Sequence, residues 1–208
     1  IEYSFKKLLS FVEKENFLGY DPYDTLNSWI PFKYLGKWPG VLATQFQKRN
    51  PINIRPILGI KREVNPKGFG LFLQSYSLLY QKTKDTRYLE KANFFFNWLV
   101  KNYTKGYAGY CWGYNFPWAG PDKLVEPFIP SSVVSGIVGK GIIAYYEATQ
   151  KKEAFVVLEG ISKFLTKNLE ITYDKSGLCA SYTPLERDCC YNASLLGAEV
   201  ISYVGKYN

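Results

Sequence analysis

The chain has 208 residues, of which 47% are apolar and 21% charged, proportions that fit one sizeable globular domain. It contains no histidine, which excludes a Ser-His-Asp triad, a Cys-His dyad and an HExxH zinc site. Lysines spread along the chain give a net charge of +8 without a block of like charges or a nucleic-acid-binding motif. We therefore expect no nucleic-acid partner, and an anionic sugar, a sugar nucleotide or plain solubility explains the charge equally well.

The first predicted element is an amphipathic helix near the N-terminus. It lies within 4-SFKKLLSFVEKENFLGYDPYD-24 and leads into the loop 19-GYDPYD-24. A less regular helix is predicted from Pro39 to Lys48, followed by an irregular stretch to Lys67.

An internal repeat dominates the rest of the chain. Residues 69–103 align with residues 135–169 at an offset of 66, and both read as helix, short polar turn, helix. The first helix of each copy is apolar all round, which predicts burial on both sides, and the second is amphipathic. Residues 191–207 resemble the buried first helix again, and residues 4–24 resemble the second helix with its loop.

This repeat predicts an all-α fold, an array of αα-hairpins forming part of an (α/α) toroid. Buried helices would form an inner ring and amphipathic helices an outer ring. The loops after the outer helices would then meet at one mouth of the ring. We expect a single domain over residues 1–208. Its hairpins are too few to close a ring, so a partner chain or a missing segment is expected to complete it.

The three loops are rich in groups that bind and process sugars, because aromatic faces stack on sugar rings and carboxylates can act as acid and base. Candidate catalytic residues are Asp21, Asp24, Tyr114 and Glu186. Candidate substrate-binding residues are Tyr20, Tyr23, Trp112, Asn115, Trp118, Tyr182 and Asp188.

Each loop also has a purely structural interpretation. The aromatic loop 106-GYAGYCWGYNFPW-118 can be packed by its own rings. Asp24 can cap the segment 25-TLNSW-29, and Glu186 and Asp188 can be solvated charges beside Arg187. The sequence leaves both interpretations open at all three loops.

The cysteines and the absence of methionine bear on context. Cys111, Cys179, Cys189 and Cys190 form no CxxC pair, and we expect reduced thiols in a cytoplasmic protein, with no metal and no cofactor. No apolar run is long enough for a membrane span, and no signal peptide is recognised. Because the chain has no methionine, even at position 1, we expect it to be a fragment of a longer protein.

The motifs 19-GYDPYDTLNS-28, 110-YCWGYNFPW-118, 181-SYTP-184 and 191-YNASLLGAE-199 resemble a family of (α/α)-toroid proteins. These proteins are similar to six-hairpin glycosidases and occur in surface-polysaccharide biosynthesis clusters. Some members carry the label delta-aminolevulinic acid dehydratase, an enzyme built as a parallel barrel, whereas this sequence predicts helical hairpins. The resemblance implies a fold and a polysaccharide context, and it supplies no catalytic residues.

Two functions follow as expectations. The first is an enzyme of polysaccharide biosynthesis or modification that acts on a glycan or sugar intermediate as hydrolase, lyase or uronyl epimerase. The second is a non-catalytic carbohydrate-binding or assembly module. A glycosidase needs two carboxylates that face each other across the substrate, at roughly 5 to 10 Å, whereas a binding module needs only the aromatic faces.

Overall fold

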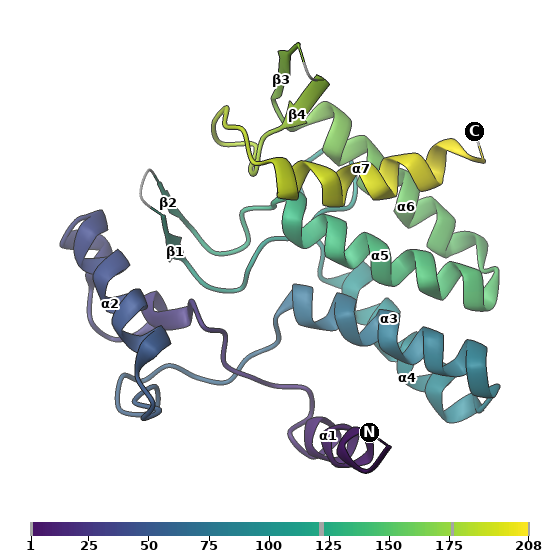
Figure 1. Ribbon diagram of the computed structural model, residues 1–208, viewed down its shortest axis with the longest axis horizontal. Helices are drawn as coiled ribbons and strands as arrows, with labels where there is room; N and C mark the ends of the chain where they lie inside the picture. The colour runs from purple at the N-terminus through teal and green to yellow at the C-terminus, as the bar shows by residue number, and fades with distance from the viewer. Residues whose placement is uncertain (1, 121–122, 176, 208) are drawn as a thin grey trace. The chain divides into compact units, whose positions relative to one another are not determined.

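The computed structural model describes residues 2–120, 123–175 and 177–207, shown in Figure 1. Within these residues there are seven α-helices and two small antiparallel ribbons of two strands each. The prediction of a mostly helical protein is confirmed, whereas the ribbons were not predicted. The chain forms two compact units. One comprises the chain up to Asn65 with Asn115–Pro127, and the other comprises Pro66–Tyr114 and the chain from Phe128 onward.

The second unit contains the predicted hairpins. Helix α3 (Pro66–Thr83) is followed by α4 (Thr86–Lys101), and α5 (Ser132–Thr149) is followed by α6 (Lys152–Lys167). The first helix of each pair has 18 residues and the second has 16. A further helix, α7 (Tyr191–Gly205), follows as the sequence indicated. The bounds of α3 and α4, shifted by the offset of 66 residues, are those of α5 and α6. The sequence repeat is therefore confirmed as a repeat of helices.

The turn inside each hairpin is built in the same way. Lys84 and Gln150 both adopt the left-handed conformation, with φ of 58° and 54°. The N–H of Lys84 donates to the carbonyl of Tyr80 at 2.8 Å, and the N–H of Gln150 donates to the carbonyl of Tyr146 at 2.7 Å. This closing bond ends the first helix and reverses the chain within two residues.

Helices α3, α5 and α7 pack side by side, and α4 and α6 pack on them from outside (Figure 1). Close contact requires glycine at the crossings, because a Cβ on Gly141 would lie 2.3 Å from the carbonyl oxygen of Gly70. At the next crossing a Cβ on Gly136 would lie 2.9 Å from the backbone of Leu196. Helix α5 is thus buried on both sides, as its uniformly apolar sequence predicted.

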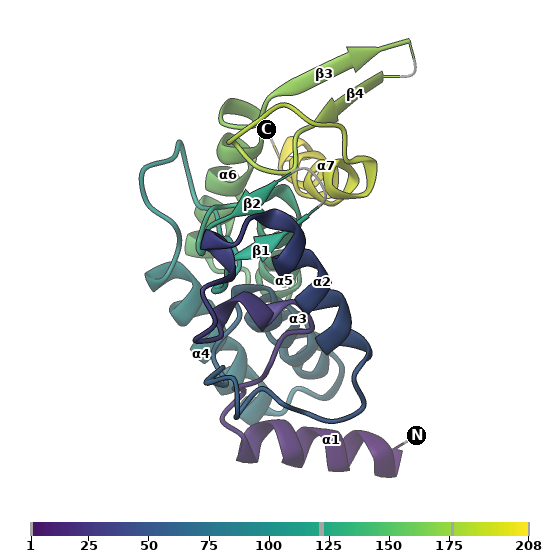
Figure 2. The ribbon, with the colours of Figure 1, turned by 90° about the vertical axis from the view of Figure 1, so that its left-hand side faces the viewer.

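A ribbon follows α6 and leads into α7. Strand β3 (Ile171–Asp174) pairs with β4 (Gly177–Ala180), with Ile171 opposite Ala180. The N–H of Ala180 donates to the hydroxyl of Ser194 at 3.0 Å and so fixes the end of β4 to α7. The ribbon projects from the helices beside α7, as the view in Figure 2 shows.

The first unit contains α1 (Glu2–Lys14), α2 (Lys37–Arg49) and the ribbon of β1 (Trp118–Ala119) with β2 (Leu124–Val125). Both helices were predicted. Helix α2 packs against a short 3₁₀ turn, Asp24–Asn27. No residue of α1 is buried, so its role as the outer helix of a third hairpin stays a prediction, as does closure into a toroid. None of the helices described has both the length and the apolar character required to span a bilayer.

Candidate functional site

The N-terminal ends of α3, α5 and α7 lie at the same end of the second unit (Figure 1). The loops that enter these helices bring five side chains together there, which we call the tyrosine cluster. Its members are Lys67, Tyr114, Ser131, Tyr182 and Asp188. Two of the predicted loops therefore meet, one from each copy of the repeat, because each enters an inner helix at the same end.

Backbone hydrogen bonds hold the second loop in place. The N–H of Ser132, at the start of α5, donates to the carbonyl of Tyr182 at 2.9 Å. The N–H of Tyr182 donates to Oδ1 of Asp188 at 2.7 Å. Asp188 therefore closes its own loop with one oxygen while remaining half-buried.

The phenol of Tyr182 is protected from ionisation. Burial is the largest cause of its raised pKa, and the neighbouring Tyr114, which shares a hydrogen bond with it, adds to the increase. A hydrogen bond with Ser131 acts in the opposite direction but does not compensate. Tyr182 is consequently neutral at physiological pH, and its raised pKa makes it a weaker acid than an ordinary tyrosine, so it is suited to hydrogen bonding rather than to proton transfer.

Tyr114 joins the cluster from the aromatic loop. Its backbone carbonyl accepts a hydrogen bond from the N–H of Phe128 at 2.7 Å. The ammonium of Lys67, in the first turn of α3, lies 5.1 Å from the centroid of the Tyr114 ring. The cluster thus combines two phenols, one carboxylate and one cation on half-buried positions.

The loop 19-GYDPYD-24 lies in the first unit, and its carboxylates are engaged by the protein itself. Asp24 is 3% exposed, and its Oδ1 accepts hydrogen bonds from Nε of Arg55 at 2.8 Å and Nε2 of Gln47 at 3.2 Å. Its Oδ2 accepts from the N–H of Asp21 at 3.0 Å. Burial raises the pKa of Asp24 despite the opposing effect of Arg55.

Asp21 and the two tyrosines of this loop are similarly held. Asp21 accepts hydrogen bonds from Nδ2 of Asn65 and from the N–H of Tyr23, both at 3.0 Å. The Tyr20 ring lies 5.4 Å from the guanidinium of Arg55, and Nζ of Lys48 donates to the Tyr23 hydroxyl at 2.5 Å. All these contacts order the loop itself. The expected N-cap is not found, because Asp24 is the first residue of the 3₁₀ turn Asp24–Asn27 and no side-chain hydrogen bond caps that turn.

The other predicted residues occupy different environments. Trp112 is 1% exposed, and its indole N–H donates to the carbonyl of Leu99 at 3.1 Å, so we leave it out of the binding site. Nδ2 of Asn115 donates to Glu63 at 2.9 Å, and Trp118 is half-buried in β1. Glu186 is exposed in the loop that carries Tyr182.

Sequence reasoning did not single out Arg55, Lys67 or Ser131. Ser131 was detectable, because a serine directly before an apolar helix is a typical N-cap, and its hydroxyl accepts from the N–H of Val134 at 3.1 Å. Arg55 and Lys67 lie in or beside the irregular stretch before α3, where no periodic pattern marks them.

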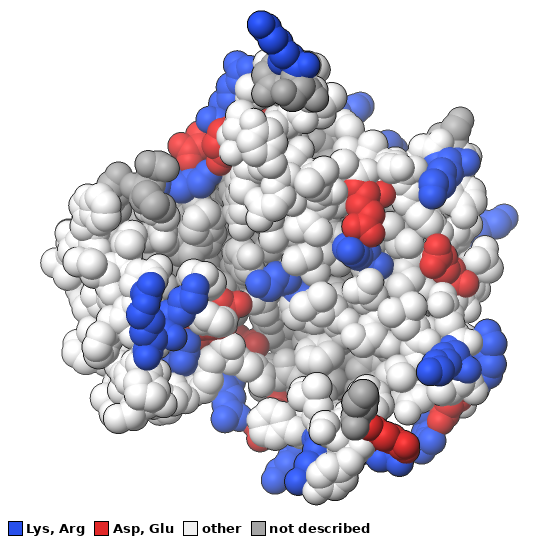
Figure 3. Space-filling model, in the orientation of Figure 1, with Lys and Arg blue, Asp and Glu red and all other residues white. Residues whose placement is uncertain are grey.

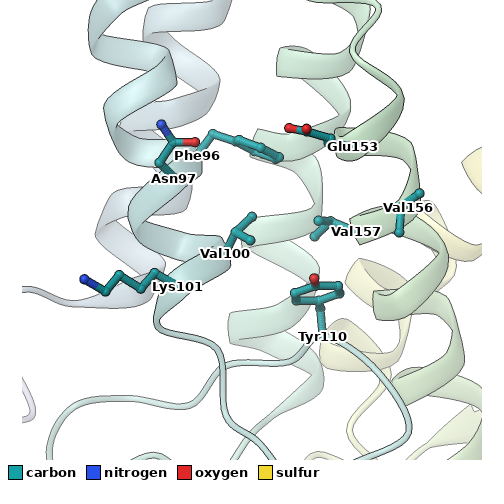
Figure 4. A pocket seen from close by; sticks show the side chains of 8 residues that line it. All are labelled: Phe96, Asn97, Val100, Lys101, Tyr110, Glu153, Val156 and Val157. Atoms are coloured by element: carbon teal, nitrogen blue, oxygen red, sulfur yellow. The ribbon is translucent and has the colours of Figure 1, made fainter.

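A separate hollow of about 340 Å³ lies between the outer helices α4 and α6. Figure 4 shows the Tyr110 ring below Val100 and Val157, with Lys101 pointing away from the hollow. Its walls are mainly apolar. The residues that line it include one phenol, Tyr110, and one carboxylate, Glu153, whereas the tyrosine cluster has two hydrogen-bonded phenols.

Neither the basic side chains on the face of the second unit seen in Figure 3 nor the potential metal ligands in the part of the chain that the structure describes form a cluster. On the face seen in Figure 3, Lys and Arg side chains of the second unit are scattered among uncharged ones. Among residues 2–120, 123–175 and 177–207, no three Cys, Asp or Glu side chains gather in a way that would hold a metal ion. All four cysteines are free thiols.

Comparison of the chain with protein-family models, with curated proteins and with solved structures gives no match. The resemblance to toroid proteins of polysaccharide clusters therefore remains an expectation from the motifs quoted above.

Proposed function

We propose that this protein is a carbohydrate-active protein of polysaccharide biosynthesis or modification, which binds its glycan or sugar intermediate at the tyrosine cluster. The observation that supports this proposal is the hydrogen-bonded pair of Tyr114 and Tyr182, with Lys67 at the Tyr114 ring and Asp188 bonded to the Tyr182 backbone. Phenols, a carboxylate and an ammonium are the groups that bond sugar hydroxyls and sugar carboxylates.

The cluster assigns different tasks to its members. A neutral Tyr182 forms a hydrogen bond with a sugar oxygen, since its raised pKa keeps the phenol protonated. Asp188 is the carboxylate offered to a sugar hydroxyl, and Lys67 favours a ligand with a negative charge. An enzyme requires a second carboxylate besides Asp188 for acid-base catalysis. In this proposal that carboxylate is Glu186, which is exposed in the same loop.

The second candidate function is a non-catalytic carbohydrate-binding or assembly module. One observation favours it over the enzyme. The carboxylates of Asp21 and Asp24 already accept hydrogen bonds from Asn65, Gln47 and Arg55, which leaves them poorly placed for acid-base work. A binding module requires only the phenols, Asp188 and Lys67.

A glycan array tests the shared part of both candidates. We expect the protein to bind an acidic or amino-sugar glycan, and Tyr114→Ala and Asp188→Asn to weaken binding by about two- to tenfold for each hydrogen bond lost. Tyr173→Ala is the matched control, because Tyr173 is 74% exposed on β3 outside the cluster. Absence of glycan binding, or equal losses in the control, would refute the proposal.

Incubation with the glycan that binds separates the two candidates. An enzyme yields new reducing ends, an unsaturated uronate or solvent deuterium in the sugar ring, and Tyr182→Phe suppresses that product. A binding module binds the glycan with the same affinity and leaves the sugar chemically unchanged. Both outcomes are read by mass spectrometry of the recovered sugar.

A further inference from the structure

A pocket of about 330 Å³ lies between the end of α6, the ribbon β3–β4 and the first turns of α7. Leu165, Ala180, Ser194 and Gly197 are among the residues that line it, and its walls are mainly apolar. Leu178, on β4, lines it and is 64% exposed, so solvent reaches the pocket from this side. Its size is at the lower end of the range for small-molecule sites.

In the first copy of the repeat, the position equivalent to Ala180 is occupied by a tryptophan. There the N–H of Trp112 donates to the hydroxyl of Ser135, the fourth residue of α5, at 3.1 Å. In the second copy the N–H of Ala180 donates to the hydroxyl of Ser194, the fourth residue of α7, at 3.0 Å. Ala180 therefore occupies the structural position of Trp112.

The indole of Trp112 fills the space between α4 and α5. It is 1% exposed, and its N–H donates to the carbonyl of Leu99 near the end of α4. Leu165 occupies the same place in α6 that Leu99 occupies in α4, and Leu165 lines the pocket. With a methyl group at Ala180 in place of an indole, the second copy has an unfilled ring site.

We propose that this pocket binds a free small molecule with a planar aromatic group that carries a ring N–H, of about the size of an indole. The ring lies against Leu165 and Gly197, and its N–H donates to the carbonyl of Leu165, as the Trp112 indole does to Leu99. The apolar walls pack against the ring faces, and the ring enters from the exposed side at Leu178. This site goes beyond the proposed glycan function and does not depend on it.

Titration of the protein with indole, followed by amide chemical shifts and calorimetry, tests the proposal. We expect saturable binding with one site, and shifts concentrated at Leu165, Ala180 and Ser194. N-methylindole should bind about three- to tenfold more weakly, because it cannot donate the ring hydrogen bond.

Two tryptophan variants locate the site. Ala180→Trp reproduces the first copy of the repeat and should abolish indole binding. Val156→Trp is the matched control, because Val156 lines the hollow between α4 and α6 and is 56% exposed. Val156→Trp should leave indole binding unchanged. If Ala180→Trp does not fold, Ala198→Phe blocks the pocket from an exposed position on α7.

Three results would overturn the proposal. They are no saturation up to the solubility limit of indole, equal binding by Ala180→Trp and the native protein, and loss of binding in Val156→Trp alone. Saturation by a tryptophan-containing peptide without saturation by indole would also overturn it, and would assign the pocket to a segment of another protein.

Discussion

The hydroxyls of Tyr114 and Tyr182 share a hydrogen bond, although the two residues belong to loops of different hairpins. Each loop follows an outer helix and enters the next inner helix, so the two tyrosines reach the same end of the helix array. The repeat therefore produces a polar cluster from two copies of one loop. The alanine at position 180, where the first copy has Trp112, produces a pocket from the same repeat.

The buried phenol and thiol groups predict a loss of stability at alkaline pH. Burial raises the pKa of Tyr182 above its ordinary value of 10.0 and raises the pKa of the Cys111 thiol from 9.0 to about 12. The folded state thus holds these protons more tightly than the unfolded state. The stabilisation from these two groups is fully present below their ordinary pKa values. It is lost as pH rises from the ordinary pKa towards the raised pKa of the folded state.

Urea denaturation between about pH 7 and pH 11 measures this effect. The free energy of unfolding should decrease with pH above about 9. The decrease should be smaller in Tyr182→Phe and in Cys111→Ala, each of which removes one titrating group. An alkaline slope identical in both variants and the native protein would contradict the prediction.

Arg55→Met should destabilise the first unit. Asp24 and Arg55 have side-chain exposures of 5% and 15%, and loss of the guanidinium leaves a buried carboxylate without its cation. A decrease of about 3–5 kcal/mol in the free energy of unfolding is expected from denaturant titration. The matched control is Arg87→Met, which breaks the exposed pair with Asp85 and should leave the transition almost unchanged.

The crossing of α3 and α5 predicts intolerance of a single methyl group. Gly141→Ala places a Cβ against the carbonyl of Gly70 and should cost about 1–3 kcal/mol, measured by thermal and chemical unfolding. Gly205→Ala is the control, because no atom lies within 4 Å of a Cβ at that position. Equal effects of the two substitutions would show that the close crossing is absent.

The thiols should differ in reactivity. Cys189 is exposed, whereas Cys111 is buried with a pKa raised to about 12, so little of its reactive thiolate forms near neutral pH. Iodoacetamide at mildly alkaline pH should therefore label Cys189 first and Cys111 last, as measured by peptide mass spectrometry over time. Labelling of Cys111 before Cys189 would contradict the burial described here.

The repeat was predictable because it depends on local patterns. Apolar residues at helical spacing give α3 to α6, and the offset between the two copies holds through helices and turns alike. The uniformly apolar character of α5 predicted its burial on both sides. The ribbons were missed because two to four residues per strand leave no periodicity to detect.

The details of the candidate sites depend on contacts that are distant in sequence. The sequence favoured ligand contact for the aromatic loop and left packing open. For Trp112 the structure shows packing, because its indole N–H donates to the carbonyl of Leu99 in α4. Similarly, the charge of Asp24 is balanced by Arg55, from a stretch without any pattern.

The aromatic loop is divided between the two units, because Tyr114 belongs to the second unit and Asn115 to the first. Convergence of all three loops thus stays a prediction.

The most direct measurement is a nuclear magnetic resonance titration of tyrosine-labelled protein with the glycan selected on the array. If the glycan binds at the tyrosine cluster, the ring resonances of Tyr114 and Tyr182 shift together with saturation, and Tyr182→Phe removes part of the affinity. Tyr34, 78% exposed in the first unit, should not respond. Shifts confined to Tyr20, Tyr23 or Tyr34, with Tyr114 and Tyr182 unchanged, would contradict the proposed site.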